Sequence, residues 1–223
     1  MNMKNYYALL FLICTTNIFL LSCSKEESNT NKSLAMKVRQ PATVSQVKIG
    51  NQVWTTKNLN VTVYRNGDLI PQVQDAAQWV NLTTGAWCYY GIYGGTYGKL
   101  YNWYAVNDPR GLAPAGYHIP TDSEWEILVS YLGGPNVAGG RMKTFTNWLF
   151  PNYGATNDSG FSGLPGGSRS YEKFVGLTAY GAWWTASDSI GYPLYRSLHY
   201  DGEYVGRGFV FDTKGFSVRC IKN

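Results

Sequence analysis

The residue types that most often carry out chemistry are sparse in this chain. Its 223 residues include two histidines, His118 and His199, which stand far apart in the sequence. A zinc site needs three or four ligands, usually in closely spaced pairs, and no such spacing occurs here. No glycine-x-serine-x-glycine motif marks a nucleophile elbow. The sequence therefore predicts neither a zinc centre nor a hydrolytic triad.

Carboxylates offer two other kinds of chemistry. Glu124 and Glu126 are spaced to point to different faces of one helix, so we expect capping and solvation from them and not a glycosidase pair. Calcium needs only oxygen ligands, and a second set of oxygen-bearing side chains falls in expected loops. That set consists of Asn157, Asp158, Asp188 and Asp201. Calcium is an open alternative; no other cofactor is expected.

Binding is better supported than catalysis, because aromatic residues make up 16% of the chain and gather among polar ones in its second half. Aromatic faces stack on sugar rings while Asp and Arg bond hydroxyls, and the same mixture makes protein-binding surfaces. At Trp183 and Trp184, strand alternation predicts one ring inside and the other outside. The residues expected to bind a ligand are Arg169, Trp184, Asp188, Tyr195, Arg196, His199, Tyr200 and Asp201.

The N-terminus predicts export. Lys4 precedes a mostly apolar run over 6–21, which is typical of a secretory signal and too short for a membrane span. The run ends in Leu20-Leu21-Ser22-Cys23, which resembles a lipobox. We expect a signal peptide over 1–22 and lipid chains on Cys23 that anchor the protein to a membrane. The alternative is an ordinary signal peptide with an incidental cysteine.

Residues 23–45 are rich in Ser, Asn, Lys and Glu and are expected to form a flexible tether. Within them Ser24-Lys25-Glu26-Glu27 resembles the mark by which some Gram-negative bacteria export lipoproteins to the cell surface; the alternative is a solvated linker. The expected location is the outer membrane, on the cell surface. The formal charge is +5 without a basic run, so nucleic acid is not an expected partner.

Two of the four cysteines remain for the domain, because Cys14 leaves with the signal and Cys23 is expected to carry lipid. Cys88 and Cys220 would lie in an oxidising compartment, where a disulfide is permitted. Such a bridge closes a loop of about 130 residues and is worth about 4–5 kcal/mol in the chain-entropy model. Two separately buried thiols are the alternative.

Several elements must position these residues. Gly50-Asn51 and Asn66-Gly67 are two-residue turn signals between strand-like stretches. A short helix is expected over 75–79 and another over 99–106. The best-defined helix starts at the capping box Thr121-Asp122-Ser123-Glu124 and ends at Gly133-Gly134.

From residue 145 onward the pattern changes to short aromatic strands separated by turn residues. No alternation of strand and helix appears, so the fold class is α+β with an irregular antiparallel sheet. The strands are expected over 182–186, 194–198, 208–211 and 216–220.

Six strings in this order resemble the Fibrobacter succinogenes major paralogous domain, which occurs in secreted and lipoprotein chains. The resemblance covers residues 46–223 and identifies them as one domain, without implying an activity. The strings are Val53-Trp54 with Asn58-Leu59, Gly85 to Tyr90, Tyr97 to Val106, Gly116 to Trp125, Leu164 to Arg169, and Gly215 to Cys220.

His118 to Glu126 and Gly215 to Cys220 are also similar, more distantly, to the formylglycine-generating enzyme family. That similarity implies a C-type-lectin-like fold of two helices and a twisted antiparallel sheet with long irregular loops. The enzymes need a pair of active-site cysteines near the C-terminus, whereas this chain has only Cys220 there. The resemblance therefore implies the fold without the activity. The calcium motifs of sugar-binding C-type lectins are also absent.

The expected function is that of a surface-anchored lipoprotein with a non-catalytic domain that recognises a glycan or an extracellular protein. Two alternatives stay open: a polysaccharide-active enzyme using loop carboxylates, and a structural or adhesive surface protein.

Overall fold

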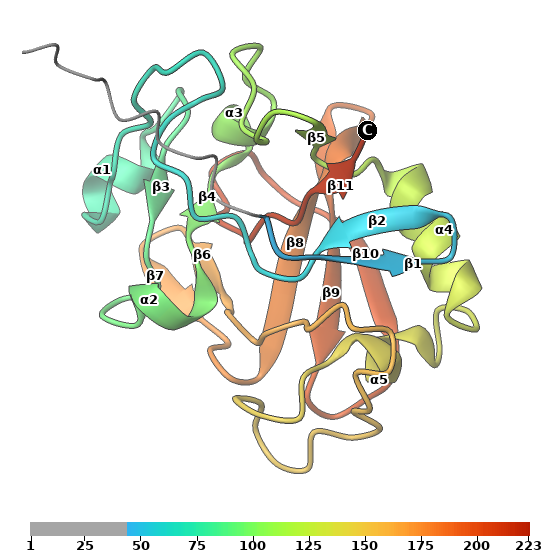
Figure 1. The fold of residues 1–223 in the computed structure, drawn as a ribbon. Coiled ribbons are helices and arrows are strands. Elements are labelled where there is room, and N and C mark those ends of the chain that lie inside the picture. The colour runs from blue at the N-terminus through green and yellow to red at the C-terminus, as the bar shows by residue number, and fades with distance from the viewer. Residues whose placement is uncertain (1–43) are drawn as a thin grey trace, which may run out of the picture. The chain divides into compact units, whose positions relative to one another are not determined.

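The structure, a computed structural model, describes residues 44–223. The predicted signal peptide over 1–22, Cys23, and the tether as far as residue 43 lie outside the described residues. The described part has short helices and antiparallel sheets, which agrees with an α+β class (Figure 1). In chain order the elements are β1 (Gln46–Ile49), β2 (Gln52–Thr55), α1 (Ala76–Val80), β3 (Trp87–Cys88), α2 (Gly94–Tyr97), β4 (Leu100–Tyr101), α3 (Trp103–Val106), β5 (Tyr117–His118), α4 (Asp122–Tyr131), α5 (Ala138–Met142), β6 (Ser168–Ser170), β7 (Lys173–Val175), β8 (Tyr180–Ser189), β9 (Tyr192–His199), β10 (Val205–Phe209) and β11 (Ile221–Lys222).

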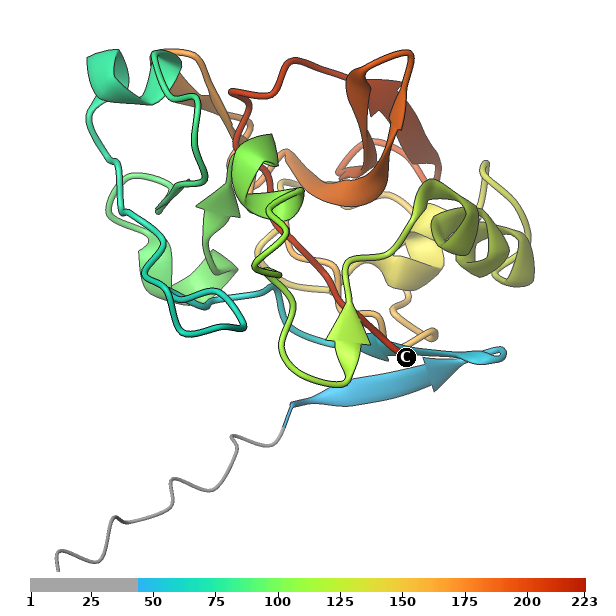
Figure 2. The same cartoon turned by 90° about the horizontal axis from the view of Figure 1, so that it is seen from above.

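The two ends of the described chain share one sheet, with strand order β1-β2-β11-β5. The β1–β2 hairpin turns at Gly50, whose φ of 59° favours glycine, as the turn signal predicts. Ile221 in β11 pairs with Trp54 on one side and with His118 on the other. Figure 2 shows the C-terminus beside the first hairpin. The last strand therefore completes the first sheet.

Helix α4 confirms the predicted capping box. The Thr121 hydroxyl accepts from the Glu124 N–H at 3.2 Å, and the Glu124 carboxylate accepts from the Thr121 N–H at 2.8 Å. Trp125 and Leu128 on the inner face are buried. The helix stops before Gly133, which has a φ of 100°.

The helix predicted over 99–106 is wrong in its first half. Leu100 and Tyr101 form strand β4, which pairs with β3, and the helix starts only at Trp103. Asn102 separates the two elements, because its side-chain oxygen accepts from the N–H groups of both Ala86 and Ala105. One side chain thus ends the strand and caps the helix.

The longest strands, β8 and β9, pair in a second sheet with order β10-β9-β8, in which β9 is the central strand. The prediction that one ring of the Trp183-Trp184 pair faces outward is wrong, because both side chains are 0% exposed. Trp183 belongs to a core cluster with Trp125 and Phe161, whereas Trp184 belongs to another with Phe216. Alternation does send the rings to opposite faces, but core covers both faces of β8.

The strand expected over 216–220 is replaced by isolated bridges at Phe216 and Ser217, and β11 begins only at Ile221. The intervening Arg219 is 0% exposed and donates to the carbonyls of Thr55 at 2.7 Å and Phe161 at 2.6 Å. This segment therefore bonds to several partners, among them β2, β4, β8 and the loop at Phe161, and not along one strand. The strand predicted over 208–211 lies a few residues earlier in the chain, as β10, which ends at Phe209.

Cys88 and Cys220 are free, buried thiols in different core clusters, so the disulfide expectation is wrong and its alternative holds. Burial raises the pKa of each thiol to about 12. The buried hydrophobic side chains of residues 44–223 form three clusters. Within that part, no helix is long and apolar enough to cross a membrane.

Candidate ligand-binding site

Two neighbouring hollows on the surface share Tyr104 and Asp212, and together we call them the groove. The larger, about 620 Å³, is the aromatic hollow. The smaller, about 340 Å³, is the polar hollow. The other walls of the aromatic hollow are Tyr171, Ile190, Gly191, Tyr192, Phe211 and Thr213. The walls of the polar hollow include Thr83, Thr84, Trp103, Asn107, Asp108 and Arg110.

The aromatic hollow is built around Tyr192 at the start of β9. Its ring lies 5.8 Å from that of Phe209 and 6.1 Å from that of Phe211, and these rings are 44%, 66% and 58% exposed. Aromatic side chains with this degree of solvent exposure are a common feature of binding surfaces. Tyr192 follows the β8–β9 turn, in which the carboxylate of Asp188 accepts from the Gly191 N–H at 3.1 Å, whereas Phe209 ends β10 and Phe211 lies just after it.

The polar hollow contains one guanidinium, and carboxylates hold it. Arg110 Nε and Nη2 lie 2.9 Å and 2.8 Å from the two carboxylate oxygens of Asp108, and Nη1 lies 3.2 Å from Asp68 Oδ2. The guanidinium also lies 4.1 Å from the centre of the Tyr64 ring. Hydrogen bonds from Arg110 lower the pKa of Asp108 to about 2. The guanidinium is thus committed within the protein.

Asp212 joins the hollows to the rest of the fold. Its backbone carbonyl accepts from the Trp103 N–H at 3.0 Å, which fixes the loop after β10 against the start of α3. Its carboxylate lies near the Tyr104 hydroxyl, whose pKa is raised first by burial and then by that negative charge. Lys214 lies nearby, with its ammonium 5.2 Å from the centre of the Tyr171 ring and a hydrogen bond to the Ser170 hydroxyl.

Two of the residues predicted to bind a ligand are structural. Arg169 is 1% exposed, and its guanidinium lies 4.5 Å from the Phe174 ring and 5.3 Å from the Trp79 ring. Trp184 is 0% exposed and donates from its indole nitrogen to the Tyr101 carbonyl at 2.7 Å. Buried as they are, neither side chain is available to a ligand, and both assignments are corrected.

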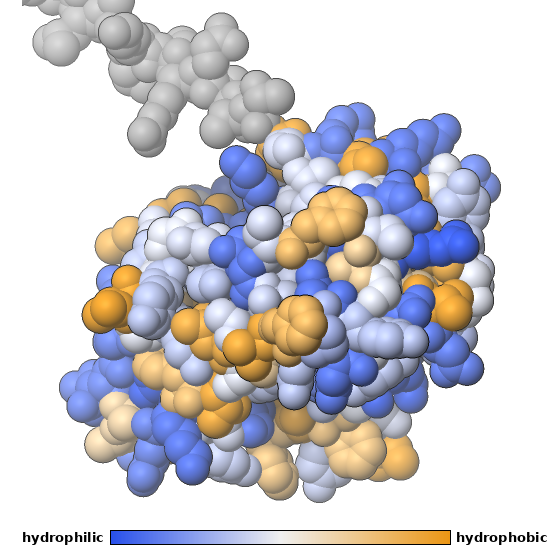
Figure 3. All heavy atoms as spheres, turned by 90° about the horizontal axis from the view of Figure 1, so that it is seen from below, coloured by the Kyte–Doolittle hydropathy of each residue, from blue (hydrophilic) through white to orange (hydrophobic). Residues whose placement is uncertain are grey.

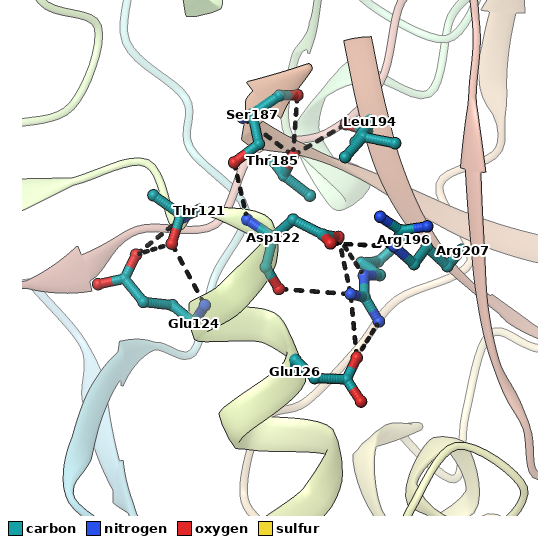
Figure 4. A network of polar contacts seen from close by, with 9 residues as sticks. All are labelled: Thr121, Asp122, Glu124, Glu126, Thr185, Ser187, Leu194, Arg196 and Arg207. Atoms are coloured by element: carbon teal, nitrogen blue, oxygen red, sulfur yellow. Dashed lines mark hydrogen bonds and ion pairs between the residues drawn. The ribbon is translucent and has the colours of Figure 1, made fainter. Parts of the chain in front are cut away.

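Arg196 is corrected as well. Its Nη2 lies 2.7 Å from Asp122 Oδ1 and 3.2 Å from Glu126 Oε2, while Arg207 Nε lies 2.9 Å from the other oxygen of Asp122 (Figure 4). The network ties α4 to strands β9 and β10. Glu124 turns away from it toward Thr121, so the two glutamates of α4 do point to different faces.

The remaining predicted residues lie outside the two hollows, although Asp188 supports their turn. Tyr195 packs on Phe216 at 4.9 Å. His199 is stacked between the rings of Tyr180, at 5.7 Å, and Tyr204, at 5.2 Å. Burial lowers the pKa of His199. Tyr200 is half-buried and Asp201 is exposed, and neither lines the groove.

Sequence reasoning missed the residues at the junction of the hollows, Tyr104 and Asp212. Tyr104 falls within the helix predicted over 99–106, and Asp212 has no motif around it. The usable signal was the alternation of Phe209 and Phe211 directly before Asp212, which places two rings and a carboxylate on neighbouring positions.

A second set of exposed apolar side chains lies in the loop after α5, where Phe145 is 70% and Phe150 is 93% exposed. Figure 3 views the molecule from below and shows hydrophobic patches interrupted by hydrophilic ones. Neither phenylalanine lines either hollow of the groove. This loop supplies matched control positions for experiments on the groove.

No group of three or more His, Cys, Asp or Glu that could hold a metal ion occurs in residues 44–223. One cradle of carbonyl oxygens is filled by a lysine instead. Lys143 Nζ donates to the carbonyls of Tyr153 at 2.7 Å, His199 at 2.9 Å and Gly202 at 2.9 Å. Calcium binding stays a prediction without a defined site.

Comparison with protein families gives a match that spans most of the chain. Residues 47–222 match the Fibrobacter succinogenes major domain (Fib_succ_major). No curated protein and no solved structure matches the chain significantly. The matched range begins in β1 and ends in β11, so it spans the whole described architecture, groove included. The chain therefore belongs to the Fibrobacter succinogenes major domain family.

Proposed function

We propose that this chain is a lipid-anchored binding protein of the bacterial cell surface, that its groove binds a glycan, and that it catalyses no reaction. The observation that carries the proposal is the groove itself, with exposed rings of Tyr192 and Phe211 at one end and Asp212 at the junction of its two hollows.

The chemistry of the groove suits a sugar better than a purely apolar ligand. A pyranose ring has an apolar face that stacks on aromatic rings and an edge of hydroxyls that hydrogen-bond to carboxylates and amides. The groove offers Tyr192 and Phe211 for the first contact and Asp212 and Asn107 for the second. Both volumes fall in the range of about 300–1,000 Å³ that is typical of small-molecule sites.

The placement at the cell surface rests on the sequence. The apolar run that ends at Cys23 supports lipidation, and Ser24-Lys25-Glu26-Glu27 supports display outside the outer membrane. A binding domain on a tether of about 20 residues reaches ligands some tens of ångströms from the membrane.

The proposal extends to the fold, which we take to be C-type-lectin-like. Three features support it: the paired chain ends in β1-β2-β11-β5, the helix α4 packed on the β8–β9 hairpin, and the long irregular stretch over 143–167.

A glycan array with residues 24–223, which contain every described core cluster, tests the proposed function. We expect retention of particular glycans, a loss of about tenfold or more in affinity for Tyr192→Ala and Phe211→Ala, and no release of reducing sugar. Phe150→Ala, which removes an exposed ring outside the groove, is the matched control.

Two results would count against this proposal. Release of reducing sugar would favour an enzyme that uses loop carboxylates. Binding of an extracellular protein that is lost in Tyr192→Ala, with no glycan retained, would assign the groove to a protein ligand.

A further inference from the structure

We infer that the groove selects a neutral glycan chain long enough to span both hollows, and that it discriminates against anionic glycans such as uronic acid polymers or sulfated chains. This inference rests on the proposed function and specifies its ligand class.

The guanidinium of Arg110 is already engaged within the protein. A guanidinium in a sugar site normally recognises a carboxylate or sulfate through paired hydrogen bonds. Here Asp108 already takes both edges of such a fork, at 2.9 Å and 2.8 Å, and Asp68 accepts from Nη1 at 3.2 Å. An anionic sugar would have to displace these carboxylates, so Arg110 gives it no free partner.

The position of Asp212 also favours a neutral ligand. It borders both hollows, and within residues 44–223 it takes part in no ion pair. A carboxylate at this junction accepts hydrogen bonds from hydroxyl groups and repels a carboxylate or sulfate group of a ligand. Asp212 therefore acts as the acceptor for a neutral sugar and as a barrier to an acidic one.

The remaining cation does not reverse this balance. Lys214 Nζ is engaged with the Ser170 hydroxyl and lies against the Tyr171 ring, and burial lowers its pKa. Among the residues that line the groove, two carboxylates (Asp108 and Asp212) stand against one cation (Arg110). The groove is net negative, which disfavours anionic ligands over its full length.

The length of the glycan chain decides how many of the groove's contacts it can make. A ligand confined to the aromatic hollow contacts Tyr192 and Phe211 but leaves the hydroxyl and amide groups of Thr84 and Asn107 in the polar hollow unused. A glycan chain that continues past Tyr104 gains those contacts while its other end is already held in the aromatic hollow. Affinity should therefore rise with chain length until both hollows are filled.

The experiment uses matched polysaccharide pairs that share a backbone and differ in charge. Affinity gel electrophoresis compares hydroxyethylcellulose with carboxymethylcellulose, and dextran with dextran sulfate. We expect the neutral member of the retained pair to bind about tenfold or more tightly than its anionic partner. Binding of the neutral member should change little between low and high salt.

Asp212→Asn tests the role of this residue, because the amide keeps hydrogen-bonding capacity and removes the charge. In this variant the ratio of the affinity for the neutral member to the affinity for the anionic member should fall by about threefold or more. Asp201→Asn is the matched control, since it makes the same charge change at an exposed position outside the groove. Oligosaccharides of the retained backbone, from one ring upward, then measure the dependence on length.

Equal or tighter binding of the anionic member by the unaltered protein would overturn the inference and leave glycan binding standing. An equal effect of Asp212→Asn and Asp201→Asn would overturn the assigned role of Asp212. Full affinity for a single ring would overturn the spanning ligand. Retention of no member of any pair would overturn both the inference and the proposed function.

Discussion

Arg196 of β9 and Asp122 of α4 form an ion pair across the packed interface of the helix and the sheet, with Nη2 2.7 Å from Oδ1 and the arginine side chain 3% exposed. In the sequence, Arg196 stands among tyrosines and suggests a ligand contact. In the fold the same residue ties α4 to β9, the strand that begins with Tyr192 of the groove.

Removal of this arginine should destabilise the domain. Arg196→Ala leaves Asp122 partly buried with Arg207 as its remaining partner, so we expect a loss of about 3 kcal/mol in the free energy of unfolding. Arg207→Ala, at a side chain 52% exposed, should cost less than about 1 kcal/mol. Urea unfolding of the two variants measures the difference; equal losses would contradict the buried role of Arg196.

The pKa of His199 should lie below the usual histidine value of about 6.5. Burial between Tyr180 and Tyr204 lowers its pKa and the charge of Lys143 lowers it further, whereas Asp201 opposes both. Because protonation is harder in the folded state, stability should fall as the pH drops from 6.5 through the folded pKa.

NMR of the imidazole protons measures this titration, and the chain has only one other histidine, His118, which His118→Asn removes for assignment. Tyr204→Ala exposes the ring of His199 and should move its pKa upward. A pKa of His199 at or above 6.5 in the unaltered protein would contradict the stacked, desolvated environment.

The thiols of Cys88 and Cys220 should not react in the folded protein. Burial raises the pKa of both to about 12, so almost no thiolate is present at neutral pH. For residues 24–223, Ellman's reagent should detect no thiol in the native state and two after unfolding in guanidinium without reductant. Detection of none after unfolding would show that a bridge had formed.

Lipidation is tested at Cys23. Cys23→Ala removes the thiol that is expected to carry the lipid, so fatty-acid labelling should be lost and the protein should leave the membrane fraction. Ser22→Ala keeps a small residue before the cysteine and is the matched control. Unchanged labelling of Cys23→Ala would refute the anchor.

The elements that the sequence predicts well are those fixed by neighbouring residues. The capping box at Thr121 and the turn at Gly50 are confirmed because both depend on hydrogen bonds and dihedral angles within a few positions. The helix over 99–106 fails in its first half because β4 pairs with β3 and because Asn102 bonds to Ala86, both contacts to another segment of the chain.

The candidate site was less predictable for a related reason. Aromatic and charged residues look alike in the sequence whether they face solvent or core, and burial of Trp184 depends on Phe216 and Trp103, which come from other segments. Likewise the groove joins α3 to the loop after β10, so its residues share no local pattern. The location of a site formed by distant segments follows from the tertiary fold alone.

The insertion of β11 between β2 and β5 has a consequence for biogenesis. Synthesis of the chain runs from the N-terminus, so Ile221 is added more than 100 residues after Trp54 and His118, and until then these two residues lack the strand that links them. The first sheet therefore forms last, and a polypeptide that lacks Ile221 and Lys222 would leave β2 and β5 without the strand between them.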